Sequence, residues 1–208
     1  MSAIARPREI AAFALRAICW SVVAFALWYA AAKPVSIAAA WGAAQILEIA
    51  EPVERARSSW RTDGVLFEIT MDATTRYRNR ISAAAVFEVA ADPRKQTYGL
   101  PFFLALLLAS RPRRIAVKAL GGAAILTALA AIGVASEVAV QLGALASSTG
   151  APLIASGVVS RTLAALGFQL GTLIFPTVVP VMLWVAMDTS LVQRIGTSLQ
   201  ARRERMAA

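Results

Sequence analysis

The sequence predicts an all-α polytopic membrane protein with four transmembrane helices, a small external β-hairpin and an amphipathic helix. Of the 208 residues, 58% are apolar and 16% are charged. A soluble domain has about a quarter charged residues and slightly under half apolar ones. Four apolar windows flanked by charge also have roughly the length that is needed to cross a bilayer core of about 30 Å. Composition and window length together therefore place the chain in a membrane.

The four windows follow one another along the chain at 13–32, 98–108, 115–135 and 162–187. The first is longer than a typical signal core and no clear cleavage site follows it, so we expect a retained helix and not a secretory signal. The second is short for a span. We expect the third helix to continue past the membrane to about Ala146. Pro176 and Pro180 predict a kink in the fourth window, because a proline frees a backbone carbonyl of the helix.

Basic residues gather in three short segments, namely the amino-terminal flank, the stretch 110–118 and the carboxy-terminal tail. An even number of spans places all three on one side, and the excess of Lys and Arg makes that side cytoplasmic. We therefore expect both termini in the cytoplasm, with the protein in a bacterial inner membrane.

The predicted organisation has four parts. They are a cytoplasmic start with the first helix at 1–32, an external module at 33–97, three further helices at 98–190 with a cytoplasmic turn at 110–114, and a basic cytoplasmic tail at 191–208. The tail is expected to lie against the anionic lipids of the inner leaflet.

The external module is predicted to contain a helix and a hairpin. Residues 34–50 carry Ile37, Trp41, Ile46 and Ile49 at helical spacing, which favours an amphipathic helix on the outer membrane surface over a fifth span. Apolar residues alternate along 65–71 and again along 81–91, around a polar connection. This pattern predicts an antiparallel hairpin. An isolated hairpin is marginal, so we expect it to pack on the helix or on another protein, and its open edges could accept a partner strand.

Two groups of residues are candidate contacts. Arg76, Arg78 and Arg80 have the period-two spacing that places three guanidinium groups on one strand face, where they could meet lipid phosphates or an acidic peptide. The alternative is a solvated hairpin tip whose arginines balance the charge of nearby acidic residues. Gly167 and Gly171 lie four residues apart with Gln169 between them, a spacing that lets another helix approach closely while a buried amide bonds across the contact. That helix can belong to this chain or to a partner.

Catalytic residues are not apparent in the sequence, and we expect no cofactor and no metal. The chain has no His and one Cys, which removes the usual imidazole base, nucleophile pairs that need His and thiolate zinc clusters. Glu48, Glu51 and Glu54 could hold a divalent cation weakly, although a solvated helix end is commoner. We found no acid near the middle of a predicted span, which argues against a proton-coupled transporter. The net charge of +9 is better explained by orientation than by nucleic acid, so no nucleic-acid partner is expected.

The segment Tyr98-Gly99-Leu100-Pro101, followed by a Leu-rich span and the basic turn Arg111-Pro112-Arg113-Arg114, is the local motif of a wider similarity. In this motif and in the order of its elements, the chain resembles the small membrane proteins associated with the type-H exosortase of bacteria. The resemblance implies a partner, a polytopic cysteine transpeptidase that sorts proteins with a carboxy-terminal membrane anchor. That enzyme uses Cys, Arg and His, so a chain without His is not the enzyme itself.

The leading functional hypothesis is a non-enzymatic accessory or scaffold subunit of an envelope protein-sorting complex, bound to a larger polytopic membrane protein such as an exosortase. The alternative is a subunit of a transporter or channel, with Arg16, Gln169 and the kink between Pro176 and Pro180 along the path. A membrane enzyme that uses external carboxylates is a third and weaker hypothesis.

Overall fold

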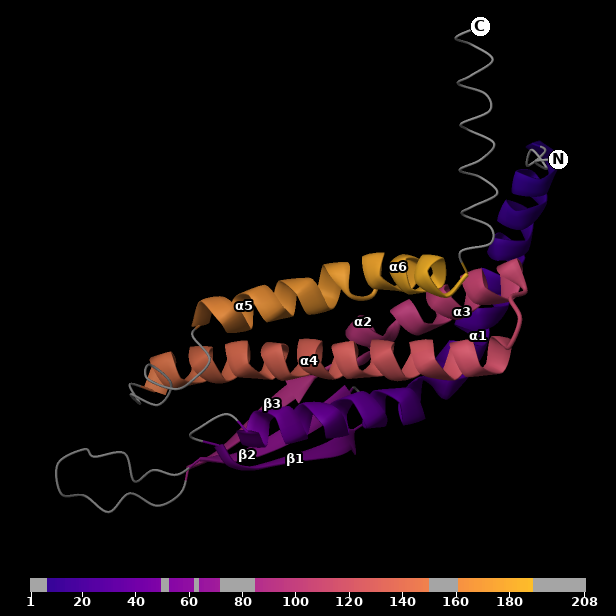
Figure 1. Cartoon of the computed structure of the whole chain (residues 1–208). Helices are drawn as coiled ribbons and strands as arrows, with labels where there is room; N and C mark the ends of the chain where they lie inside the picture. Colours follow the sequence, from indigo (N-terminus) through magenta and orange to yellow (C-terminus); the bar gives the residue numbers. More distant parts are fainter. Residues whose placement is uncertain (1–6, 50–52, 62–63, 72–84, 150–160, 189–208) are drawn as a thin grey trace, which may run out of the picture.

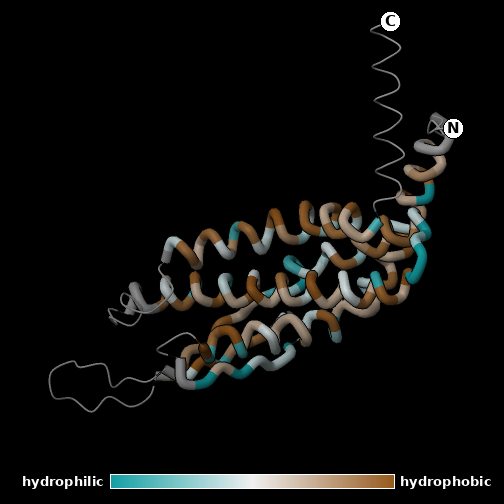
Figure 2. The backbone as a smooth tube through the Cα atoms, in the orientation of Figure 1, coloured by the Kyte–Doolittle hydropathy of each residue, from teal (hydrophilic) through white to brown (hydrophobic). Residues whose placement is uncertain are grey.

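A computed structural model describes residues 7–49, 53–61, 64–71, 85–149 and 161–188 of the chain. Long helices run side by side in it, and a small antiparallel sheet lies along one end of the bundle (Figure 1). Figure 2 shows hydrophobic residues along the long helices. Hydrophilic residues lie at strand β1 (Val53–Arg61), at the short helix α2 (Arg94–Thr97) and at the turn between α3 (Gly99–Ser110) and α4 (Ile115–Thr149).

Helix α1 runs without interruption through Pro7–Ile49, 43 residues in all. The predicted boundary at Lys33 and Pro34, between a first span and a separate surface helix, is therefore wrong: Pro34 lies inside one helix. Runs of three alanines lie shortly before and after this proline, at 30–32 and 38–40, and the high helix propensity of alanine offsets the backbone hydrogen bond that proline removes.

The second half of α1 packs inside the protein through a face that does not include the predicted apolar stripe. Its buried hydrophobic residues are four alanines, Ala39, Ala40, Ala43 and Ala44, and Leu47. The predicted apolar stripe of Ile37, Trp41, Ile46 and Ile49 is exposed on the other side. The small alanine side chains let the helix approach the sheet closely. The bulky stripe faces away from the sheet, where it is available to contact lipid or a partner.

The sheet has three antiparallel strands in the order β1-β2-β3. They are β1 (Val53–Arg61), β2 (Gly64–Met71) and β3 (Ala85–Ala91). The predicted hairpin is present as β2 and β3, with Val65 paired with Ala91 and Met71 with Ala85. Strand β1 was not expected, because its sequence, VERARSSWR, lacks alternating apolar residues.

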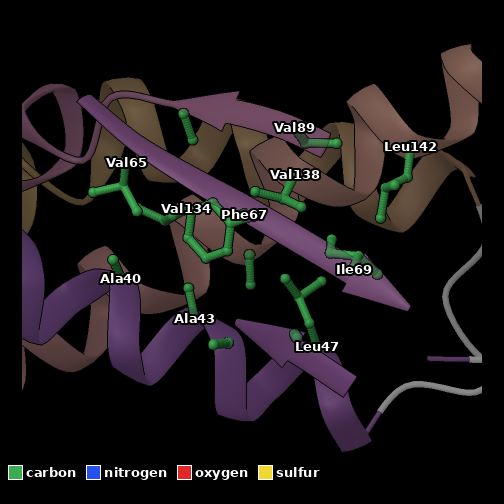
Figure 3. Packing of buried hydrophobic residues seen from close by; sticks show 14 residues of the cluster. Ala40, Ala43, Leu47, Val65, Phe67, Ile69, Val89, Val134, Val138 and Leu142 are labelled. Carbon is green, nitrogen blue, oxygen red and sulfur yellow. The ribbon is translucent and has the colours of Figure 1, made fainter. Parts of the chain in front are cut away.

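One face of the sheet forms the first hydrophobic core, and the predicted alternation is confirmed there. Val65, Phe67, Ile69 and Val89 are almost fully buried. They pack against the second half of α1 and against Val134, Val138 and Leu142 of helix α4 (Figure 3). The sheet therefore packs on helices of its own chain, one of the two arrangements that the sequence allowed.

A second core lies at the other end of the bundle. Helix α2 (Arg94–Thr97) leads into α3 (Gly99–Ser110), which has 12 residues and spans roughly 18 Å. Leu100, Phe103 and Leu107 of α3 are buried against Leu126 and Trp184. Helix α4 (Ile115–Thr149) has 35 residues, which confirms that the third helix continues beyond its predicted span.

The fourth predicted span is kinked, as its prolines indicated. It consists of α5 (Arg161–Gln169), the π-helix η1 (Leu170–Ile174) and α6 (Val178–Met187). The two arms, Thr162–Ile174 and Val178–Met187, meet at 63°. Pro176, which lies in this break, is fully buried.

Four transmembrane helices are not confirmed. In the described ranges, α1 and α4 are long and apolar enough to cross a membrane, and the bent pair makes a third span if it is counted as one. Helix α3, with 12 residues, is too short to cross a membrane alone. Phe13 of α1 stacks on Trp184 of α6 with ring centroids 5.5 Å apart, and Lys118 of α4 donates to the carbonyl of Met187. The start of α1, the start of α4 and the end of α6 thus lie together.

Candidate functional site

A polar pair is buried where α2 meets α4. The amide Nε2 of Gln96 donates to Oε2 of Glu137 at 2.8 Å, and the two side chains are 3% and 7% exposed. Neighbouring Thr97 is 1% exposed. A carboxyl group out of water needs a donor, because burying it without one is strongly unfavourable. Gln96 supplies that donor from a separate helix, so the pair fixes α2 against α4.

The unbroken course of α4 decides where Glu137 lies. Glu137 lies two residues beyond the predicted third window, 115–135, in the part of the helix that was expected to continue past the membrane. The structure places Glu137 inside α4 and within the candidate span Ile115–Leu145. The expectation that no acid lies within a span thus holds for the predicted window 115–135, but not for the longer span Ile115–Leu145. A lone Glu in an otherwise apolar helical stretch was the available signal.

Close backbone contacts surround the polar pair. A Cβ atom at Gly171 would lie 2.5 Å from the Cα of Gly133, so α4 and η1 touch through their main chains. Tyr98 donates its hydroxyl to the carbonyl of Thr172 at 3.3 Å. The junction thus joins the start of α3, the middle of α4 and the π-helix. Single π-turns of this kind occur frequently at functional sites.

An aromatic side chain with two cations lies at the sheet side of this junction. Trp60 of β1 has Lys33 Nζ at 5.9 Å and the guanidinium carbon of Arg94 at 5.5 Å from its ring centroid. Both cations are within the range of a cation–π interaction. Tryptophan and long basic side chains are also the residues that gather at a membrane–water interface.

Of the two predicted contact groups, the structure describes the glycine pair but not the three arginines. Gly167 and Gly171 pack inside the chain on α4: a Cβ at Gly167 would meet Ser136, and Gly171 meets Gly133. Of the two possible neighbours for this glycine pair, the structure therefore shows one within the chain. Gln169 is exposed in the described structure, so its amide is not buried in the contact with α4, and a contact of Gln169 with a partner remains a prediction. Arg76, Arg78 and Arg80 lie outside the described residues.

The residues proposed for a transport path lie at different places in the described structure, and Glu51 of the proposed cation site lies outside the described residues. Arg16 donates to the carbonyl of Ala12 within α1, toward the end that contains Trp184, whereas Gln169 ends α5 beyond the Gly133–Gly171 contact. Glu48 accepts a hydrogen bond from the backbone N–H of Ala56 at 3.1 Å. No group of three potential metal ligands occurs in the described part of the chain.

Comparison with known families decides the relationship. A family described as exosortase H-associated membrane protein matches residues 7–191, nearly the whole chain. The chain belongs to this family. No curated protein and no solved structure matches it.

Membership of the exosortase H-associated family agrees with the apolar helices: the chain is a membrane protein linked to the exosortase H system. The family is described by this association and not by an enzymatic activity of its own.

Proposed function

We propose that the chain is a non-enzymatic accessory subunit of a membrane complex built around the type-H exosortase, and that its sheet is an external module held for use by that complex. The observation that carries the proposal is the family match over residues 7–191. The absence of His from the sequence supports a partner role, because the chain lacks the imidazole that a Cys–His transpeptidase needs.

The dimensions of the long helices support an external position for the sheet. Helices α1 and α4 have 43 and 35 residues, or roughly 65 and 52 Å at about 1.5 Å per residue. A bilayer core takes about 30 Å of that length. The sheet packs on the second half of each helix, while the first halves pack with α3 and α6. We place the membrane around that first half, and Trp60 with its two cations at the outer interface.

Co-purification tests the association directly. The full chain, tagged at its carboxy terminus, is co-expressed with the exosortase H of the same genome, extracted in mild detergent and captured. We expect the exosortase to be recovered with the tagged chain, while an unrelated polytopic membrane protein at matched expression is lost. A lone, monodisperse chain that moves a solute in proteoliposomes would instead support the transporter hypothesis.

A second experiment separates an accessory role from mere association. Deletion of the gene should reduce processing of exosortase substrates in cells, and restoring the full chain should restore it. A chain with Glu137→Gln keeps an isosteric hydrogen-bonding group, so it should complement the deletion if no catalytic carboxyl is needed. Loss of processing with normal protein levels in this variant would contradict the non-enzymatic proposal.

A further inference from the structure

Strand β1 forms one edge of the sheet, and part of its backbone is directed away from β2. The strand order β1-β2-β3 leaves β1 with a single strand neighbour. The N–H of Ala56 donates to the carboxylate of Glu48 in α1 and therefore does not point at β2. Backbone groups of an antiparallel strand alternate in direction with a period of two residues. The N–H and C=O groups of Ser58 and Trp60 consequently point to the same open side as Ala56.

These outward groups beyond Ala56 are not satisfied within the described part of the chain. Glu48 caps Ala56, but no hydrogen bond joins another element to the backbone of Ser58 or Trp60 there. Natural edge strands usually carry protection, since an unpaired row of donors and acceptors is a template for another strand. In this sheet, the hydrogen bond from Ala56 to Glu48 protects only the first part of the β1 edge.

The exposed side chains of β1 are strongly basic. Arg55, Arg57 and Arg61 are exposed and alternate along the strand. One acid faces them in the register, Glu68 opposite Arg57, while Thr70 and Gly64 lie opposite Arg55 and Arg61. Lys33 and Arg94 add two more cations around Trp60 near the end of the strand. The charge along this edge thus exceeds what the neighbouring strand neutralises.

We infer that the open edge of β1 around Ser58 and Trp60 binds an extended acidic peptide segment of another protein by strand addition. Main-chain hydrogen bonds to the outward groups supply affinity in this mode, and alternate side chains supply specificity. Carboxylates at alternate positions of the added strand would lie beside Arg55 and Arg57, where each guanidinium group can donate two hydrogen bonds to a carboxylate. The connection between β2 and β3 is a poor occupant, because Arg76, Arg78 and Arg80 give it the same charge as the edge.

The binding test uses the full chain in lipid nanodiscs of neutral lipid and a fluorescent nine-residue peptide that alternates Glu and Thr. We expect saturable binding by anisotropy that weakens with added salt. Two further peptides carry backbone N-methyl groups on all Thr or on all Glu residues. An added strand directs alternate amides toward the edge, so one methylated peptide should lose about tenfold in affinity and the other should bind normally. Equal binding of both would overturn strand addition.

Protein variants test the same edge independently. Ser58→Pro removes an outward donor while leaving the β1–β2 ladder intact, because proline is tolerated on the open side of an edge strand. It should weaken peptide binding about tenfold, whereas Ser58→Ala, which keeps the N–H, should not. The double variant Arg55→Gln/Arg57→Gln should lose most of the salt-sensitive binding, with Arg113→Gln at the other end as its control.

Lipid is the competing ligand for these cations. Failure to bind the peptide, together with adsorption to phosphatidylglycerol vesicles that depends on Arg55 and Arg57, would overturn the inference and assign these arginines to headgroups. Because the peptide arm uses no exosortase, its result is independent of the co-purification that tests the proposed function. Circular dichroism and the unfolding midpoint of each variant show whether the sheet is retained, and the methylated peptides decide the matter if Ser58→Pro does not fold.

Discussion

Gln96 and Glu137 share one hydrogen bond in the buried contact between α2 and α4. Such pairs have an asymmetric energy: removing one partner leaves the other buried and unsatisfied, whereas removing both does not. The amide oxygen of Gln96 already has no partner in the described structure. The junction therefore depends on both side chains being present, and a double-mutant cycle can measure the coupling.

We predict that Glu137→Leu lowers the free energy of unfolding by about 1–3 kcal/mol, because it leaves the Gln96 amide without its acceptor. Gln96→Leu should cost at least as much, since a carboxyl then lacks its donor. The double variant should be closer to the wild type than the sum of the two single changes. Thermal unfolding in detergent micelles, followed by circular dichroism, measures all three. Simple additivity would show that the pair is not coupled.

At the scale of elements, proline at position 34 distinguishes one continuous helix from two. Within a helix interior, proline is about 3 kcal/mol less favourable than alanine, whereas in a first turn it is well tolerated. Since α1 continues through Pro34, we predict that Pro34→Ala raises the free energy of unfolding by about 1–3 kcal/mol. Pro112→Ala, in the turn between α3 and α4, is the control and should bring no such gain. Unchanged stability in Pro34→Ala would favour the broken helix of the sequence analysis.

The close approach of α3 to α4 gives a second prediction, with its control one residue away. A Cβ at Gly122 would meet the ring of Phe103, while one at Gly121 meets nothing within 4 Å. Phe103 is fully buried and belongs to the second core. Gly122→Ala should therefore destabilise the protein by about 1–3 kcal/mol through overpacking. Gly121→Ala should stabilise it by roughly 0.5–1 kcal/mol, because alanine is the better helix residue. Unfolding midpoints of the two variants should move in opposite directions.

How far the sequence predicted these elements depended on the kind of signal. Alternation at Val65, Phe67 and Ile69 identified a strand and its buried face, since a period of two admits one register. The β1 strand carried no such pattern, because its inner face consists of Ala56, Ser58 and Trp60, which do not form a run of apolar residues. Continuity across Pro34 and burial of Glu137 depend on tertiary contacts, which local propensity does not contain. The Gly167–Gly171 spacing indicated a close helix contact, but only the structure showed that its neighbour is α4.

For the molecule as a whole, the arrangement of ends follows from the helix order. The start of α1, the α3–α4 turn and the end of α6 meet at one end, through Phe13, Trp184 and Lys118. The sheet lies at the opposite end of α1 and α4 (Figure 1). A membrane around the first half of the bundle would therefore separate the basic α3–α4 turn from the sheet.

We predict that a single cysteine on the sheet and one in that turn react on opposite sides of the membrane. Both replacements, Glu88→Cys in β3 and Arg113→Cys, are made in a Cys19→Ser background, and both positions are exposed. In intact spheroplasts, a membrane-impermeant maleimide should label position 88, while position 113 should react only after permeabilisation. The basic turn stays inside because translocating its arginines is unfavourable. Labelling of both positions in intact spheroplasts would place sheet and turn on one side, and would remove the external module from the proposed function.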